Sequence, residues 1–228
     1  MAINVYWAVL EHEWMRAEPP VEVLKTVFDN YTLSETGVAR CPAFRDGFNN
    51  MYALKSLYDY EFEITDKTVG SSYYDQKFFD QHVVVRSLPE RCFSFFQYYL
   101  FLTDEDSLLM TGNMFPFMES NNITERCVVF QGTYDIGRWY RNLEFPFILR
   151  KKYDTFRIEQ GEIYSYVKFH TNEKINLIQF RSRDNLANLL DEVVNIRENR
   201  KSIWTMVDFY KRMKCRKQIL DIVKKSVI

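Results

Sequence analysis

The spacing of apolar residues changes once along this chain, and that change constrains the fold more than any other feature. Between residues 40 and 181 the apolar and aromatic residues fall in short segments with the two-residue period of a β-strand. From Asn185 onward the period becomes that of a helix, about 3.6 residues. The residues that carry this second period are Leu186, Leu189, Leu190, Val193, Val194, Ile203, Val207 and Tyr210. The sequence therefore predicts a mainly β chain with a C-terminal helical segment.

The strand pattern is clearest from Tyr52 to Ile64, where apolar and polar residues alternate as in a strand pair or one long bent strand. Residues 21–39 fit a helix or a strand. Amphipathic helices, which a parallel βαβ fold would place between strands, are missing from the pattern. We therefore predict an antiparallel β-sandwich or jelly roll in residues 1–181, with residues 182–228 as a helical appendage packed on it. Further strands are expected at 3–10, 82–87, 92–102, 125–131, 143–150, 162–170 and 174–181.

The composition agrees with a packed β structure in a reducing compartment. The chain has 19 Phe and 15 Tyr but only 7 Gly, and aromatic side chains suit a pleated, half-buried surface. The four cysteines are too far apart for close metal-ligand spacing, so we expect reduced core thiols. The first residues lack the pattern of a secretory signal, and the longest apolar stretch is about half of what a membrane-spanning helix needs. We expect a soluble protein without a membrane span.

Positive charge is concentrated at the end of the sequence. Residues 197–228 contain ten Lys or Arg and three Asp or Glu, although the whole chain has a net charge of −1. Such a helix could bind nucleic-acid phosphates, an anionic membrane or the acidic body of a neighbouring subunit, or it could simply be a solvated face. The residues predicted to bind a partner here are Lys211, Arg212, Lys214, Arg216 and Lys217.

A second candidate contact segment is Gly137-Arg138-Trp139-Tyr140-Arg141, where two arginines flank two aromatic residues. Arg138, Trp139 and Arg141 could stack a base, a sugar or a proline-rich peptide and bind a phosphate or carboxylate. The alternative is a corner between strands in which Trp139 covers one end of the sandwich and the arginine stems pack on aromatic rings. The sequence favours this structural interpretation.

If the fold is a jelly roll, the sequence offers one plausible set of ligands for a non-heme iron centre. Such a centre uses two histidines and one carboxylate, and His82, His170 and Asp80 are the available trio. The usual His-x-Asp/Glu order is absent. The sequence also lacks G-x-S-x-G, P-loop, dinucleotide-binding and H-E-x-x-H motifs. No cofactor and no catalytic residue is therefore predicted, and the iron enzyme is kept as an alternative.

A further pattern lies in four segments, residues 40–46, 50–56, 138–145 and 156–169. These segments resemble uncharacterised proteins of tailed phages, notably those of marine cyanobacteria. Where those proteins have Ser-Pro-x-Asp, this chain has Ser56-Leu57-Tyr58-Asp59, so the turn that the proline fixes differs here. The resemblance implies a phage origin and a β-rich core, and it carries no assigned activity.

These observations together predict a non-catalytic phage accessory or virion-associated protein in the host cytoplasm or the virion. It would act through protein–protein interaction with a partner or with itself. The two alternatives are the iron enzyme and a nucleic-acid binder that uses the basic C-terminal helix.

Overall fold

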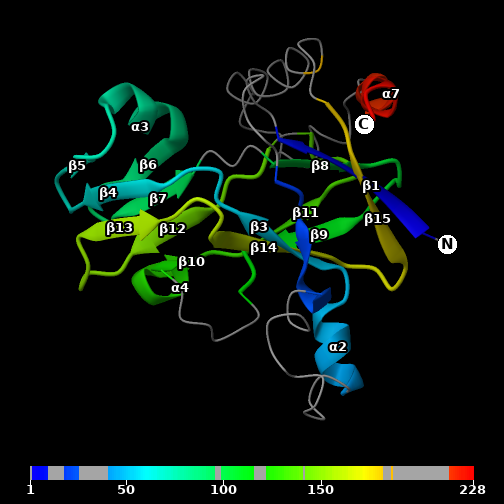
Figure 1. Ribbon diagram of the computed structural model, residues 1–228, viewed down its shortest axis with the longest axis horizontal. Coiled ribbons are helices and arrows are strands. Elements are labelled where there is room, and N and C mark those ends of the chain that lie inside the picture. The colour runs from blue at the N-terminus through cyan, green and yellow to red at the C-terminus, as the bar shows by residue number, and fades with distance from the viewer. Residues whose placement is uncertain are drawn as a thin grey trace, which may run out of the picture.

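The computed structural model describes residues 2–9, 18–25, 41–95, 99–115, 122–140, 142–181, 186 and 216–228. Strands dominate this part of the chain (Figure 1), which confirms the predicted mainly β class. The helices are α2 (Pro42–Phe48), α3 (Gln76–His82), α4 (Asn122–Arg126) and α7 (Arg216–Lys225). The strands are β1 (Ala2–Val9), β2 (Val21–Glu22), β3 (Met51–Lys55), β4 (Tyr60–Ile64), β5 (Val69–Gly70), β6 (Val83–Ser87), β7 (Cys92–Phe95), β8 (Tyr99–Thr103), β9 (Leu109–Gly112), β10 (Cys127–Val129), β11 (Gly132–Asp135), β12 (Pro146–Leu149), β13 (Thr155–Ile158), β14 (Ile163–Phe169) and β15 (Lys174–Gln179).

The strands form four hydrogen-bonded sheets that pack around one main core. Their strand orders are β15-β1-β8, β10-β12-β7-β6, β11-β9-β14-β3-β2 and β13-β4-β5. Sheet β13-β4-β5 packs on sheet β10-β12-β7-β6 through phenylalanine rings, with the centroids of Phe62 and Phe93 5.0 Å apart. Sheet β15-β1-β8 meets the five-stranded sheet where Phe101 lies 5.7 Å from Phe169. The aromatic residues of the sequence thus supply the interior of a sandwich-like arrangement.

One strand pairing departs from the predicted antiparallel topology. β1 pairs with β8 antiparallel, as expected. With β15 it pairs in parallel over six residue pairs, from Ala2 opposite Lys174 to Trp7 opposite Gln179. Parallel neighbours require a long connection, and here residues 10–173 separate the two strands. Because this contact depends on tertiary packing, the local apolar pattern contained no sign of it.

The strand regions predicted at 52–64 and 92–102 are each divided between two sheets. Residues 52–64 form β3 and β4, and the intervening turn is closed by the Ser56 hydroxyl, which donates to the Tyr58 carbonyl at 2.7 Å. Residues 92–102 form β7 and β8. The strands predicted at 82–87 and 125–131 begin instead with the ends of α3 and α4, and the strand predicted at 143–150 covers only Pro146–Leu149.

Cysteine burial agrees with the expectation of reduced core thiols at two of three described positions. Cys92 and Cys127 are buried and free, and burial raises the pKa of the Cys127 thiol to about 12. Cys41 is exposed, contrary to that expectation, and is the N-cap residue of α2, ahead of Pro42 in the first turn. Cys215 lies outside the described residues.

Candidate functional site

Arg216, the first residue of α7, joins the two segments that the sequence analysis selected for partner binding. Its Nε donates to the Gly137 carbonyl at 3.1 Å. Its Nη2 donates to the carbonyls of Asp104 and Glu105 at 3.0 and 2.8 Å, and its Nη1 pairs with the Asp106 carboxylate at 3.2 Å. A guanidinium group suits this task because its donors form a rigid planar fork.

After Arg216, the rest of α7 packs along the outer face of sheet β15-β1-β8. Ile219 and Val223 are fully buried there, and Figure 1 shows α7 beside β15 and β1. At the other end of the helix, Lys224 forms an ion pair with Asp104 at 2.9 Å. The hydrogen bond to Asp104 raises the pKa of Lys224. The side chains of this second, smaller cluster are Tyr6, Ala8, Leu100, Leu102, Tyr140, Phe180, Leu186, Ile219 and Val223.

The turn around Gly137 is held by Asp135. The Asp135 carboxylate accepts hydrogen bonds from the Leu108 and Gly137 amides, both at 3.1 Å, and pairs with Arg138 at 3.7 Å. The half-buried Trp139 contacts Tyr134 edge to face, with the ring centroids 4.7 Å apart. The segment is therefore a corner between β11 and β12, as the sequence analysis favoured, but Arg138 pairs with Asp135 where packing on aromatic rings was expected. We call the combination of Asp104–Asp106, Asp135–Tyr140 and α7 the corner surface.

The structure therefore brings Arg138, Trp139, Arg216 and Lys217 to the corner surface. Arg138 and Trp139 are half-buried and Lys217 is exposed. The other predicted contact residues, Arg141, Lys211, Arg212 and Lys214, lie outside the described residues. Sequence reasoning missed the acidic run Asp104–Asp106 as the partner of the tail, although opposite charge in the two runs was a usable signal.

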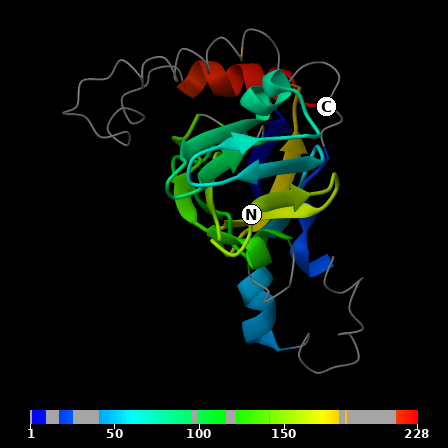
Figure 2. The same cartoon turned by 90° about the vertical axis from the view of Figure 1, so that its left-hand side faces the viewer.

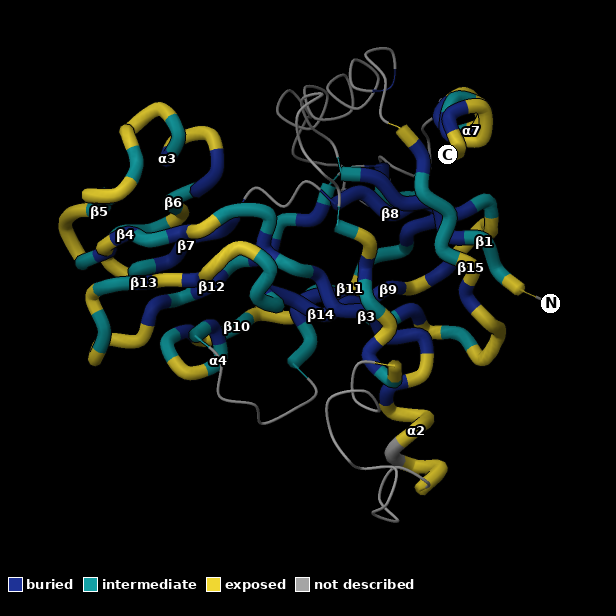
Figure 3. Tube along the Cα trace, viewed as in Figure 1, coloured by how far each residue is buried: buried dark blue, intermediate teal, exposed yellow. Residues whose placement is uncertain are grey.

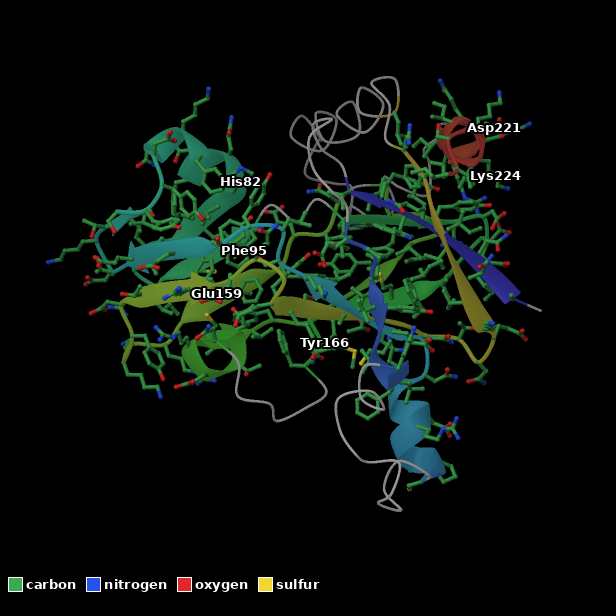
Figure 4. The ribbon with its side chains drawn as sticks, viewed as in Figure 1. His82, Phe95, Glu159, Tyr166, Asp221 and Lys224 are labelled. Atoms are coloured by element: carbon green, nitrogen blue, oxygen red, sulfur yellow. The ribbon has the colours of Figure 1, made fainter. Side chains whose placement is uncertain are left out.

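The predicted iron ligands do not form a metal site. The Asp80 carboxylate is on the exposed side of α3 and accepts a hydrogen bond from Gln76 at 2.7 Å. His82 is buried against Tyr58 and Phe78, with ring centroids 4.6 and 4.1 Å away, and Figure 4 shows it at the end of α3. Within the described ranges, no three His, Cys, Asp or Glu side chains are grouped so that they could hold a metal ion. The iron alternative is therefore wrong for this trio.

The third member of the proposed trio, His170, belongs to a polar chain on the five-stranded sheet. Its Nε2 is 2.6 Å from the Thr111 hydroxyl, which is 2.8 Å from the Thr133 hydroxyl. Burial and the neighbouring Lys168 lower the pKa of His170, which favours the neutral ring. A hydroxyl beside a neutral imidazole is the beginning of a nucleophile–base pair. In the described part of the chain, however, no carboxylate orients the imidazole, so the arrangement is incomplete for acyl transfer.

His82 should make the stability of the protein sensitive to mild acid. Burial lowers the pKa of His82 below its ordinary value of 6.5, so the unfolded chain binds this proton more readily than the folded one. The stabilisation by the neutral ring is therefore complete above about pH 6.5 and is lost as the pH falls through the lower, folded-state pKa. Urea unfolding from about pH 7 to about pH 5 should show a shallower pH dependence for His82→Phe than for the wild type. An unchanged slope in His82→Phe would contradict this assignment.

Comparison of the chain with protein families, curated proteins and solved structures finds no match. Among the described helices, none is both long enough and apolar enough to cross a membrane.

Proposed function

We propose that this protein is a non-catalytic phage accessory or virion-associated protein that acts by binding another protein, including further copies of itself. The phage assignment rests on the sequence resemblance. The interaction role is supported by one observation above all: Arg216 gathers the arginine–tryptophan turn and the basic helix, which are far apart in the sequence, into one surface.

The composition of the corner surface suits protein recognition. Protein interfaces are enriched in arginine and aromatic residues, and Arg138 and Trp139 are adjacent and partly exposed. Around them lie exposed charges of both signs, including Lys217 and Asp106. Val227 and Ile228, next to the end of α7, add exposed apolar side chains, with 45% and 65% of their surface accessible.

Nucleic-acid binding through the tail receives less support from the geometry. Arg216 and Lys224 pair with Asp106 and Asp104 of the same chain. Those cations are therefore partly neutralised, whereas phosphate binding would use cations that are free to displace counterions. A protein partner with mixed charge fits this surface better.

Amine-reactive crosslinking, followed by mass spectrometry, tests the interaction role in lysate or virions from the cells that produce the protein. We expect Lys217 and Lys225 to crosslink to one dominant protein, and Arg138→Glu, which leaves both reactive amines in place, to weaken that capture. The matched control is Arg181→Glu, because Arg181 is an exposed arginine that follows β15. Two outcomes would contradict the proposal: an unchanged capture by Arg138→Glu, or near-stoichiometric transition metal in the purified protein, which would indicate an enzyme.

A further inference from the structure

One end of the molecule carries a strongly acidic face beside α3. Residues 57–82 contain six acidic and two basic side chains. The carboxylates of Asp59, Asp75 and Asp80 accept hydrogen bonds from the Gln160 amide, the Phe78 amide and the Gln76 side chain. All three donors are neutral, so these bonds leave the negative charges uncancelled. We call the surface formed by Asp59, Tyr73, Asp75 and Asp80 the acidic face.

An aromatic residue stands out from the acidic face. Tyr73 has 66% of its surface exposed, the largest value among the exposed large apolar side chains of the described residues. Its ring is 4.9 Å from Tyr74, which in turn stacks on Phe78 at 4.2 Å. An exposed ring two residues from the exposed carboxylate of Asp75 is a good site for a lysine or arginine side chain, because the cation interacts with both the ring and the negative charge.

The same end of the molecule carries a basic face. Arg150, Lys151 and Lys152 follow one another in the turn between β12 and β13 and are all exposed. Arg126, at the end of α4, is close to this turn, since the Arg150 amide donates to its carbonyl at 2.8 Å. We call these four residues the basic face. In the described part of the chain, none of the four forms an ion pair with a carboxylate.

Tyr153 supports the basic face from below. The Arg126 guanidinium and the Lys152 ammonium lie 5.0 and 4.6 Å from the centroid of its ring. The nearby acid Asp154 is already paired with Arg91 at 2.7 Å, and Glu125 accepts a hydrogen bond from the Tyr153 hydroxyl at 2.8 Å. The positive charge therefore outweighs the negative charge here, and the ring holds two of the cations in place.

The two faces lie on opposite sides of this end of the molecule. Figures 1 and 2 both place α3 on the upper side, with α4 and the turn between β12 and β13 lower down. Figure 3 shows exposed residues in both places. Because they point in different directions, the two faces cannot pair within one molecule, but the acidic face of one copy can meet the basic face of another.

We propose that copies of this protein associate head to tail, with the basic face of one copy docked on the acidic face of the next. This inference deepens the proposed function, on which it rests, by naming a second copy as a partner and by giving the contact. Lys151 of one copy would stack on Tyr73 of the next, and Lys152, held over Tyr153, would pair with Asp75 or Asp80. A contact between two different faces is heterologous, so it continues into a ring or a filament and does not stop at a symmetric dimer.

Sedimentation velocity on the purified full chain tests this contact. At about 50 mM salt the average sedimentation coefficient should rise with protein concentration, and at about 0.5 M salt it should fall to that of the monomer, because salt screens exposed charges. Tyr73→Ala/Asp80→Lys on the acidic face and Lys151→Glu/Lys152→Glu on the basic face should each weaken self-association by about tenfold or more, because like charges then face each other. The double variant Lys174→Glu/Arg181→Glu changes a similar charge at exposed positions in and just after β15, which Figure 1 places well away from α3 and α4, and should associate like the wild type.

Mixing the two face variants gives the decisive result. Each alone lacks one face, but an equimolar mixture contains one intact acidic face and one intact basic face, and its two charge-reversed faces also carry opposite charges, so the mixture should regain self-association that neither variant shows alone. A monomeric mixture, a wild-type protein that stops at a symmetric dimer, or face variants that associate normally would overturn the proposal. Binding of a DNA oligonucleotide by the wild type, abolished in Lys151→Glu/Lys152→Glu and without self-association, would assign the basic face to nucleic acid instead. Crosslinking at Lys217 tests the corner surface independently. A failure of the head-to-tail contact can therefore be told apart from a failure of the proposed function.

Discussion

Replacing Phe93 with alanine is expected to lower the free energy of unfolding by about 3–5 kcal/mol, the usual cost of removing a fully buried phenylalanine ring. Phe93 has no exposed surface. Its ring centroid lies 5.0 Å from Phe62, 5.2 Å from Phe156 and 5.7 Å from Phe147. The ring therefore joins sheet β13-β4-β5 to sheet β10-β12-β7-β6, and no neighbour can fill its place without disturbing both sheets.

Urea denaturation followed by circular dichroism measures this effect, with Phe93→Leu as the control. Leucine is apolar and only somewhat smaller than phenylalanine, so Phe93→Leu should lower the free energy of unfolding by less than about 1.5 kcal/mol. Domains of this kind are typically stable by only about 5–15 kcal/mol, so the alanine variant should unfold at a clearly lower urea concentration. Equal losses in the two variants would show that the ring is not closely packed.

Replacing Gly112 with alanine is expected to destabilise the protein by about 3 kcal/mol or more, for the opposite reason: too little space. A β-carbon at residue 112 would lie 2.0 Å from Cζ of Phe145 and within 2.9 Å of two further atoms of that ring. Phe145 is completely buried, and β9 is held by β11 on one side and β14 on the other. Neither the ring nor the strand can therefore move away cheaply.

Two further variants make the Gly112 result specific. Gly47→Ala is the matched control, because a β-carbon there meets nothing within 4 Å. Gly47 lies inside α2, where alanine is the better helix former, so this variant should gain up to about 1 kcal/mol. Phe145→Leu should partly rescue Gly112→Ala in a double-mutant cycle, since the two changes act on one contact. If the losses of the two single variants simply add in the double variant, the predicted clash between residue 112 and the Phe145 ring is wrong.

The candidate site illustrates how far local patterns reach. Arg138, Trp139 and the basic tail were all recognisable from residue type and spacing. Their meeting was not, because it depends on one side chain, Arg216, that binds carbonyls about 80 to 110 residues away in the sequence. Backbone carbonyls have no sequence signature, so no pattern of residue types could indicate them as the acceptors.

His82 shows a second limit of inference from local sequence. Sequence proximity suggested that Asp80 and His82 could act together, yet a helix places the carboxylate of Asp80 toward solvent and the ring of His82 in the interior. A two-residue spacing puts side chains on the same face of a strand but on different faces of a helix. The error in the iron alternative therefore began with an error in one element, since residue 82 ends α3 and does not start β6.

The sequence by itself determined the mainly β class, the positions of most strands and the apolar, aromatic content of the core, because these depend on residue type and on periodicity within a few residues. The tertiary structure alone decided that β1 and β15 pair in parallel, that residues 52–64 and 92–102 are shared between sheets, and that α7 is fastened to the Asp104–Asp106 run. The physical reason is common to all three. Each depends on contacts between residues far apart in the chain, whose free energy comes from burial and charge pairing in the assembled fold and leaves no local periodicity to read.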